Sequence, residues 1–134
     1  MKEGEFFFDT NVLLYLLSGD TAKAGRAEQV LSRGGVISVQ VLNEFAAVTR
    51  GKFGMAWAEI DDILSSIRPL CQVVPLDVAT HENGLRLAER HGFSVYDAMI
   101  VASALLCGCR VLLTEDLNDG QQVEGFLTIE NPFI

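Results

Sequence analysis

Cysteine is scarce in this sequence and is not arranged as a disulfide framework. Its three cysteines, Cys71, Cys107 and Cys109, cannot all pair within one chain, and such an odd, sparse set is typical of the reducing cytosol. A chain of 134 residues buries roughly two-thirds of its unfolded surface, so its core needs neither disulfides nor a structural metal. We therefore expect a cytoplasmic protein.

Long hydrophobic runs are also absent. The longest nearly uncharged stretch, Ala98 to Cys109, is well short of the roughly 20 residues that a membrane-spanning helix requires. The apolar run Phe6–Phe8 is too short for the hydrophobic region of a signal peptide. These limits predict a soluble protein that does not enter a membrane.

Basic residues are few. Ten Lys and Arg against eighteen Asp and Glu give a formal net charge of −8, which argues against a protein that coats nucleic acid nonspecifically. This charge does not exclude a nuclease, because a catalytic site built from carboxylates adds to the same negative total. Zinc is not expected either, since Cys107 and Cys109 have no third or fourth ligand nearby, and His81 and His91 lack metal-ligand spacing.

No Pro/Ser-rich linker, repeat or low-complexity tract interrupts the chain, so we expect one domain over residues 1–134. Short apolar runs alternate with longer segments of helical period. The expected strands are 6–8, 36–39, 73–74 and 110–114, with a further candidate at 126–129. The first expected helix begins near residue 11, with Leu16 and Leu17 facing the core. The other expected helices are 21–31, 41–48, 56–67, 78–91 and 95–106. This alternation predicts an α/β fold, a three-layer α/β/α sandwich with a central, mainly parallel sheet of four to five strands.

Acidic side chains follow the carboxyl ends of the expected strands, which is where ligands bind in open parallel sheets. Asp9 follows the first strand, and Glu44 lies one or two helical turns after the second. Asp97 stands near the start of the most apolar helix. The fourth strand runs into Thr114-Glu115-Asp116, with Asp119 shortly after it. Four or five carboxylates are therefore expected at one edge of the sheet.

Carboxylates at such close quarters need protons or a bound cation. Two like charges about 4 Å apart repel by roughly 4 kcal/mol at an effective dielectric constant of 20. Oxygen ligands from scattered Asp and Glu residues suit Mg²⁺ or Mn²⁺, and such an ion stabilises charge on a phosphodiester. One ion and two ions are both compatible with the sequence.

Each acid also has a purely structural interpretation. Asp97 stands three residues after Ser94 and is placed to complete a helix-capping box, and Asp9 is placed to cap the first helix. Glu44 is equally compatible with surface exposure, and Asp119 before Gly120 is typical of a turn. The shared placement of the acids at strand ends, rather than any single position, favours a site.

Four segments of the chain resemble the PIN-domain family, and within it the VapC-type ribonuclease toxins. They are Phe7-Phe8-Asp9-Thr10-Asn11-Val12-Leu13-Leu14, Val41-Leu42-Asn43-Glu44-Phe45, Tyr96-Asp97-Ala98-Met99-Ile100-Val101-Ala102-Ser103-Ala104 and Leu113-Thr114-Glu115-Asp116-Leu117. The resemblance extends over nearly the whole chain, with the segments in the family's order, and the closing Thr128-Ile129-Glu130-Asn131-Pro132-Phe133 is similar to the family's last strand.

The resemblance implies a metal-dependent endoribonuclease, the toxin of a toxin–antitoxin pair, with Mg²⁺ or Mn²⁺ as cofactor. It implies that the metal and catalytic residues are Asp9, Glu44, Asp97 and Asp116, and that Thr10, Asn11 and Thr114 support them, with Asp119 a secondary candidate. Between Glu115 and Asp116, the T-x-D spacing from Thr114 favours Asp116. The family's VapC members also imply a homodimer and a cognate antitoxin that places a basic side chain among the acids.

The RNA itself also has to be held by the protein. Arg50 and Lys52, which flank Gly51 soon after Glu44, are the better candidates for phosphate contacts; Arg86 and Arg90 share a helix with acidic residues and favour a solvated surface. With so few cations, we expect specificity for a structured RNA, tRNA being one candidate.

An aromatic and aliphatic patch around Trp57, with Phe53, Met55 and Ile60, is assigned to the core, with a dimer or antitoxin groove as the alternative.

Other function classes fit the sequence less well. A receiver-like phosphoacceptor domain would use Asp77, but it requires paired acids after the first strand, where Asp9-Thr10-Asn11 stands. A haloacid-dehalogenase-type phosphatase requires a second Asp at the position of Asn11. A catalytically inactive PIN module that only binds RNA or a protein is the remaining alternative.

Overall fold

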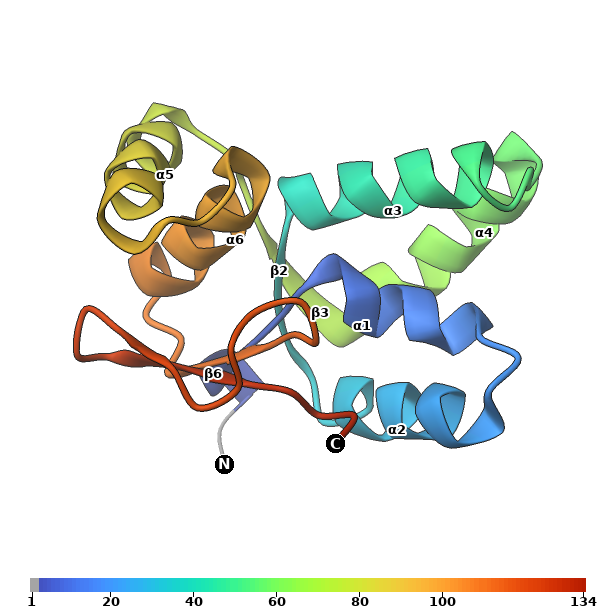
Figure 1. Ribbon diagram of the computed structural model, residues 1–134. Helices are drawn as coiled ribbons and strands as arrows, with labels where there is room; N and C mark the ends of the chain where they lie inside the picture. The colour runs from blue at the N-terminus through green and yellow to red at the C-terminus, as the bar shows by residue number, and fades with distance from the viewer. Residues whose placement is uncertain (1–2) are drawn as a thin grey trace.

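The computed structural model describes residues 3–134 and contains one sheet flanked by helices (Figure 1). The strands are β1 (Phe6–Phe8), β2 (Gly35–Ser38), β3 (Cys71–Val74), β4 (Val111–Leu113), β5 (Gln122–Val123) and β6 (Leu127–Glu130). The α-helices are α1 (Thr10–Leu14), α2 (Thr21–Leu31), α3 (Val39–Gly51), α4 (Trp57–Ile67), α5 (Val78–His91) and α6 (Val95–Leu106), and short 3₁₀ helices are η1 (Glu3–Glu5), η2 (Tyr15–Leu17) and η3 (Arg68–Leu70).

The sheet has the strand order β3-β2-β1-β4-β6-β5, and every neighbouring pair is parallel except β5 with β6. The predicted α/β class and mainly parallel sheet are confirmed. The expected count of four to five strands is wrong, because β5 has only two residues and is too short to give an alternating pattern. Among residues 3–134, no helix is long and apolar enough to cross a membrane.

The helices form two layers on opposite sides of the sheet, with α5 and α6 on one side and α1 to α4 on the other (Figure 1). From β1 the chain steps outward through β2 to β3, and then returns to β4 on the other side of β1. The carboxyl ends of β1 and β4 therefore flank a topological switch point, which is the usual ligand-binding position in open α/β sheets.

Both faces of the sheet are buried. Phe7 and Phe8 are consecutive in β1, so their side chains point to opposite faces, and both are fully buried. Ile37, Leu112 and Ile129 from the neighbouring strands are fully buried as well. Burial of each large apolar side chain stabilises the fold by about 1.5–3 kcal/mol. This core fixes the strand ends that carry the acidic residues.

A close approach between β1 and β2 explains Gly35. A Cβ atom at this position would lie 2.6 Å from Cε2 of Phe8 and 2.8 Å from the carbonyl oxygen of Phe6. Any side chain at position 35 would therefore clash with the Phe8 ring and the β1 backbone.

The helices at 21–31, 78–91 and 95–106 have the predicted bounds, whereas the first helix differs. It ends at Leu14 and continues as the 3₁₀ turn η2, whose tighter winding rotates the following side chains relative to an α-helix. Leu17 is consequently 38% exposed, and its predicted core position is wrong. The core assignment of the aromatic patch is also wrong for two members, since Phe53 is 54% and Trp57 is 62% exposed.

Candidate active site

Asp9 and Thr114 form the centre of the candidate site. They directly follow β1 and β4, which pair in parallel with Phe8 opposite Leu113. The backbone N–H of Asp9 donates to the carbonyl oxygen of Leu113 at 3.0 Å, which extends the pairing beyond the strands. The Thr114 hydroxyl donates to Oδ2 of Asp9 at 2.8 Å. The residues that follow these two paired strands thus hold the Asp9 carboxylate in place.

Asp9 is also the N-cap of α1. Its Oδ1 accepts from the backbone N–H of Thr10 at 2.6 Å, and the residue is only 4% exposed. The predicted cap is therefore confirmed, and it is compatible with the predicted site role, because the cap uses Oδ1 and the Thr114 hydroxyl donates to Oδ2.

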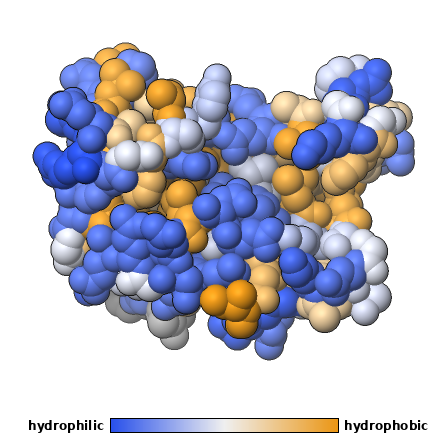
Figure 2. All heavy atoms as spheres, viewed as in Figure 1, coloured by the Kyte–Doolittle hydropathy of each residue, from blue (hydrophilic) through white to orange (hydrophobic). Residues whose placement is uncertain are grey.

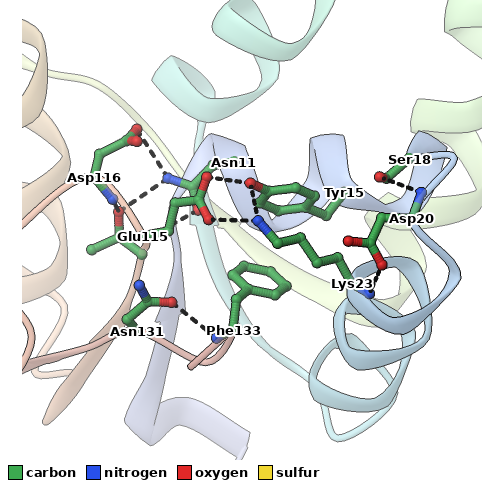
Figure 3. A network of polar contacts seen from close by, with 10 residues as sticks. Asn11, Tyr15, Ser18, Asp20, Lys23, Glu115, Asp116, Asn131 and Phe133 are labelled. Atoms are coloured by element: carbon green, nitrogen blue, oxygen red, sulfur yellow. Dashed lines mark hydrogen bonds and ion pairs between the residues drawn. The ribbon is translucent and has the colours of Figure 1, made fainter.

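Asn11 joins Asp9's neighbourhood to the loop after β4 (Figure 3). Its Nδ2 donates to Oγ1 of Thr114 at 3.0 Å and to Oδ2 of Asp116 at 3.1 Å, and its Oδ1 accepts from the backbone N–H of Glu115 at 3.2 Å. The Thr114 hydroxyl oxygen also accepts from the backbone N–H of Asp116 at 3.1 Å. These bonds orient Asp116 toward the site.

Glu115 lies on the opposite side of this loop from Asp116 (Figure 3). Its carboxylate accepts a hydrogen bond from the Tyr15 hydroxyl and lies 3.6 Å from Nζ of Lys23. Lys23 also donates to the Tyr15 hydroxyl at 3.1 Å. Because Glu115 already has a cationic partner, Asp116 is the better candidate for a metal ligand.

Glu44 is held from two sides on α3. Its Oε1 accepts from the Thr10 hydroxyl at 2.7 Å, and its Oε2 accepts from Nε2 of Gln40 at 2.8 Å. Thr10 is the residue next to Asp9, so this bond ties α3 to the end of β1. Both bonds fix the direction of the Glu44 carboxylate.

Asp97 lies in the first turn of α6 and is half-buried. Its backbone N–H donates to Oγ of Ser94 at 3.1 Å, so Ser94 caps the helix. The reciprocal bond of a capping box does not form within residues 3–134, where the Asp97 carboxylate has no hydrogen-bond partner. Its side chain is therefore available for a ligand.

The acids act on one another electrostatically. Burial raises the pKa of the Asp9 carboxyl from 3.8 to about 7, and the negative charges of Asp116 and Glu44 add to the rise against the opposing hydrogen bonds. Burial likewise raises the pKa of Asp97, and the same two charges contribute. Asp116 and Glu44 are therefore close enough to both Asp9 and Asp97 to disfavour their ionised forms.

The donor set fits a hard divalent cation. Within the described part of the chain, no Lys, Arg or His side chain forms an ion pair with Asp9, Glu44, Asp97 or Asp116. Among residues 3–134, no three acidic, His or Cys side chains lie close enough together to hold a metal ion without moving. Unneutralised carboxylate oxygens supported by Thr and Asn side chains are the ligand chemistry that Mg²⁺ and Mn²⁺ prefer.

Other residues considered from the sequence lie elsewhere. Oδ1 of Asp119 accepts from the backbone N–H of Asn131 at 2.8 Å and thereby fixes the loop after β4 to the end of β6. Arg50 donates to the carbonyl oxygen of Met55 at 2.9 Å and lies over the Trp57 ring at 4.7 Å, while Lys52 is exposed at the end of α3. Arg50 and Lys52 remain predicted phosphate contacts.

Asp77 follows the edge strand β3 and caps α5 by accepting from the backbone and hydroxyl of Thr80. It is thus two strands from Asp9 in the sheet, which argues against a receiver-like site that would use both residues.

Gln40, Tyr15 and Lys23 were not predicted to take part. Gln40 was detectable in principle, because it precedes Glu44 by four residues on one helix face. Tyr15 and Lys23 had no such signal, since their partner Glu115 lies about a hundred residues further along the chain.

Comparisons with known proteins agree with this geometry. The sequence matches the PIN domain family over residues 6–120. A toxin–antitoxin complex from Klebsiella pneumoniae is 22% identical, with 94% of this chain and 96% of that chain covered and a TM-score of 0.70. DNA-bound VapBC from Salmonella typhimurium is 19% identical, with 96% and 98% covered and a TM-score of 0.71.

VapC20 from Mycobacterium tuberculosis, described as a sarcin-ricin loop cleaving toxin, is 20% identical, with 80% of this chain and 86% of that chain covered and a TM-score of 0.66. At identities this low, the likeness to these structures concerns the fold alone. No curated protein matches the chain.

Proposed function

This chain belongs to the PIN domain family, and from that premise we propose that it is a metal-dependent endoribonuclease that acts as the toxin of a toxin–antitoxin pair. The observation that carries the proposal is the set of four carboxylates, Asp9, Glu44, Asp97 and Asp116, at the switch point of the sheet without a basic partner within residues 3–134. A purely structural group of acids would be expected to be neutralised by Lys or Arg.

The similar structures support the substrate class. VapC20 is described as cleaving the sarcin-ricin loop, and two further similar structures are toxin–antitoxin complexes. The net charge of −8 leaves few cations for nonspecific phosphate contacts, so we propose a structured RNA, tRNA among the candidates, as the substrate.

The chain's own residues would hold and orient the reacting groups. Asp9, Asp97, Asp116 and Glu44 would hold Mg²⁺ or Mn²⁺, which supplies the positive charge that stabilises a phosphodiester during hydrolysis. The hydroxyls of Thr10 and Thr114 keep Glu44 and Asp9 in fixed directions through bonds of 2.7 and 2.8 Å. Asn11 keeps Asp116 directed at the same place. Such fixed positions reduce the reorganisation that the reaction requires.

An antitoxin is the proposed protein partner. A cavity of about 690 Å³ between α2 and α4 has mainly apolar walls, including Leu16, Leu31, Ile63 and Ile67. Hydrophobic side chains are visible in the hollow on the right-hand side of the molecule in Figure 2, between the α3–α4 end and the α2 side. An amphipathic helix of a partner would cover this surface. A homodimer is proposed from the family relationship.

RNA cleavage by the purified chain tests the proposal. Total RNA is incubated with the protein in Mg²⁺ or Mn²⁺, beside Asp97→Asn and a control, Asp61→Asn, which changes an exposed acid on α4. We expect discrete cuts that disappear with EDTA and in Asp97→Asn but persist in Asp61→Asn. Absence of metal-dependent cuts by the unmodified chain would contradict the enzyme and favour an inactive binding module. Uptake of acetyl phosphate at Asp77 without RNA cleavage would instead support a receiver.

A further inference from the structure

We propose that a pocket beside the acidic site binds one nucleobase of the RNA next to the bond that is cut, and thereby sets a nucleotide preference. The pocket, called here the side pocket, has a volume of about 260 Å³, and its lining includes Asn11, Leu14, Tyr15, Leu17, Phe53 and Glu115. Its size is below the roughly 300–1,000 Å³ of pockets for drug-sized ligands, as expected for a single base. This inference rests on the proposed ribonuclease function.

The side pocket adjoins the acidic site through two residues. Asn11 lines the pocket and donates to Oδ2 of Asp116 at 3.1 Å. Glu115 lines it as well and is the chain neighbour of Asp116. A nucleotide whose phosphate lies among the acids would therefore extend its own or the adjacent base into this pocket.

The walls of the side pocket suit the face of a nucleobase. Leu14 and Leu17 are apolar, and Phe53 is an aromatic side chain that is 54% exposed. Bases of RNA stack on exposed aromatic rings when they are unpaired and splayed outward. Phe53 lies in the turn between α3 and α4, where more than half of its surface is open to a ligand.

The polar side of the pocket is held by ring contacts, a hydrogen bond and an ion pair among Tyr15, Lys23 and Glu115 (Figure 3). The Tyr15 ring packs at 4.5 Å from the Phe133 ring and under Nζ of Lys23 at 4.7 Å, which fixes its hydroxyl beneath Glu115. Lys23 lies 3.6 Å from the Glu115 carboxylate, so this edge repels an RNA strand less than do Asp9, Glu44, Asp97 and Asp116, which form no ion pair within residues 3–134.

Glu115 gives the side pocket a chemical preference. Each carboxylate oxygen has a further lone pair beyond its bonds with Tyr15 and Lys23, and a carboxylate only accepts hydrogen bonds. Guanine, adenine and cytosine present to it an exocyclic amino group with two N–H donors, whereas uracil presents only its single ring N3–H. The side pocket should therefore favour a base with an amino group over uracil.

Binding of nucleotides is measured first, without any cleavage. The ¹⁵N-labelled full chain is titrated with the four ribonucleoside 5′-monophosphates and with ribose 5-phosphate, which lacks a base. We expect NMR shifts at Leu14, Leu17 and Phe53 with the nucleotides, weakest for UMP, and not with ribose 5-phosphate. Because Phe53 is exposed, Phe53→Leu should fold normally, lose the stacking ring and weaken binding by about 5-fold or more, whereas Phe53→Trp should retain it.

A matched control changes an exposed Phe elsewhere. Phe126 is 40% exposed beside Arg110 in the turn before β6, and Phe126→Leu should leave the affinity unchanged. Shifts confined to other surfaces, or equal affinities for Phe53→Leu and the unmodified chain, would overturn the side pocket. If an apolar peptide binds in the side pocket and none of the nucleotides does, the base-binding proposal is overturned in favour of a protein partner.

Cleavage sites separate this inference from the proposed function. The 5′ ends of fragments from a random-sequence RNA are sequenced after digestion by the unmodified chain, Phe53→Leu and Glu115→Gln. We expect an amino-bearing base at one fixed position beside the cut, and a weakened preference in both variants. Metal-dependent cuts whose flanking preference is the same in all three proteins would refute the side pocket and leave the nuclease intact. Base-dependent NMR shifts without any cuts would refute the nuclease and retain the base-binding pocket.

Discussion

Replacing Asp9 by Asn should stabilise the metal-free protein at pH 8 and slightly destabilise it at pH 4. Burial raises the pKa of Asp9 from 3.8 to about 7, so the folded state resists ionisation that the unfolded state permits. One pKa unit corresponds to about 1.4 kcal/mol, so the carboxylate lowers the free energy of unfolding by about 4 kcal/mol at pH 8 relative to acid pH.

The pH window follows from the direction of this shift. The folded-state pKa is raised, so the stability associated with the protonated form is complete below about pH 4 and is lost as the pH rises to about 7. An Asn side chain does not ionise, but it cannot accept the Thr114 hydroxyl's hydrogen bond through Nδ2, which costs about 1 kcal/mol. The expected net gain of the variant at pH 8 is therefore about 3 kcal/mol.

Urea unfolding followed by far-UV circular dichroism, in EDTA and at pH values from 4 to 8, measures this difference. The stability difference between Asp9→Asn and the unmodified chain should change sign across the range. Asp62→Asn, an exposed acid on α4, serves as the control and should parallel the unmodified chain. A difference between Asp9→Asn and the unmodified chain that is constant with pH would refute the assignment of Asp9 as a buried acid opposed by its neighbours.

Three further predictions concern the metal, the packing and the thiols. Mn²⁺ at about 100 times its dissociation constant should raise the free energy of unfolding of the unmodified chain by about 2.7 kcal/mol, as measured by thermal unfolding. The rise should be much smaller in Asp97→Asn, and an equal rise in both proteins would contradict a role of Asp97 in metal binding. Gly35→Ala should destabilise the fold by about 1–3 kcal/mol, because its Cβ would lie 2.6 Å from the Phe8 ring. Gly25→Ala on α2 should stabilise the fold by up to about 1 kcal/mol, because within residues 3–134 no atom beyond its own helix and chain neighbours lies within 4 Å of its Cβ. Urea unfolding that ranks the two variants in the opposite order would refute the packing argument. Hydrogen bonding with the Cys109 thiol, whose Sγ lies 3.5 Å away, lowers the pKa of Cys107 to about 7. Iodoacetamide should therefore alkylate Cys107 rapidly at pH 7.5, and more slowly either at pH 6 or in Cys109→Ala at pH 7.5. Mass spectrometry that shows the same alkylation rate in that variant would exclude this activation.

Local sequence signals were sufficient for most helices. Asp20 and Ser94 cap α2 and α6 with side-chain bonds to backbone N–H groups, and Gly92 ends α5 at a φ of 76°. Such signals involve residues within one turn of each other, so periodicity and capping rules locate them. The positions of the acids at strand ends followed from the same reasoning.

The sequence pattern did not predict which strands and side chains pair over long distances in the chain. The strand order places β4 beside β1, and no local feature of either strand specifies that neighbour. The pairing of Glu115 with Tyr15 and Lys23 depends on this order, because it joins the loop after β4 to the helices after β1. The two-residue strand β5 and the 3₁₀ turn η2 were missed because each is shorter than one period of the patterns that reveal strands and helices.

Anomalous diffraction from a crystal grown in Mn²⁺ gives the most direct measurement of where the divalent ion lies. We predict a manganese peak among the carboxylates of Asp9, Glu44, Asp97 and Asp116 in a crystal of the unmodified chain. A crystal of Asp97→Asn grown in the same solution should show a weaker peak or none. Manganese bound only at other surfaces, with these carboxylates directed away from one another, would contradict the account.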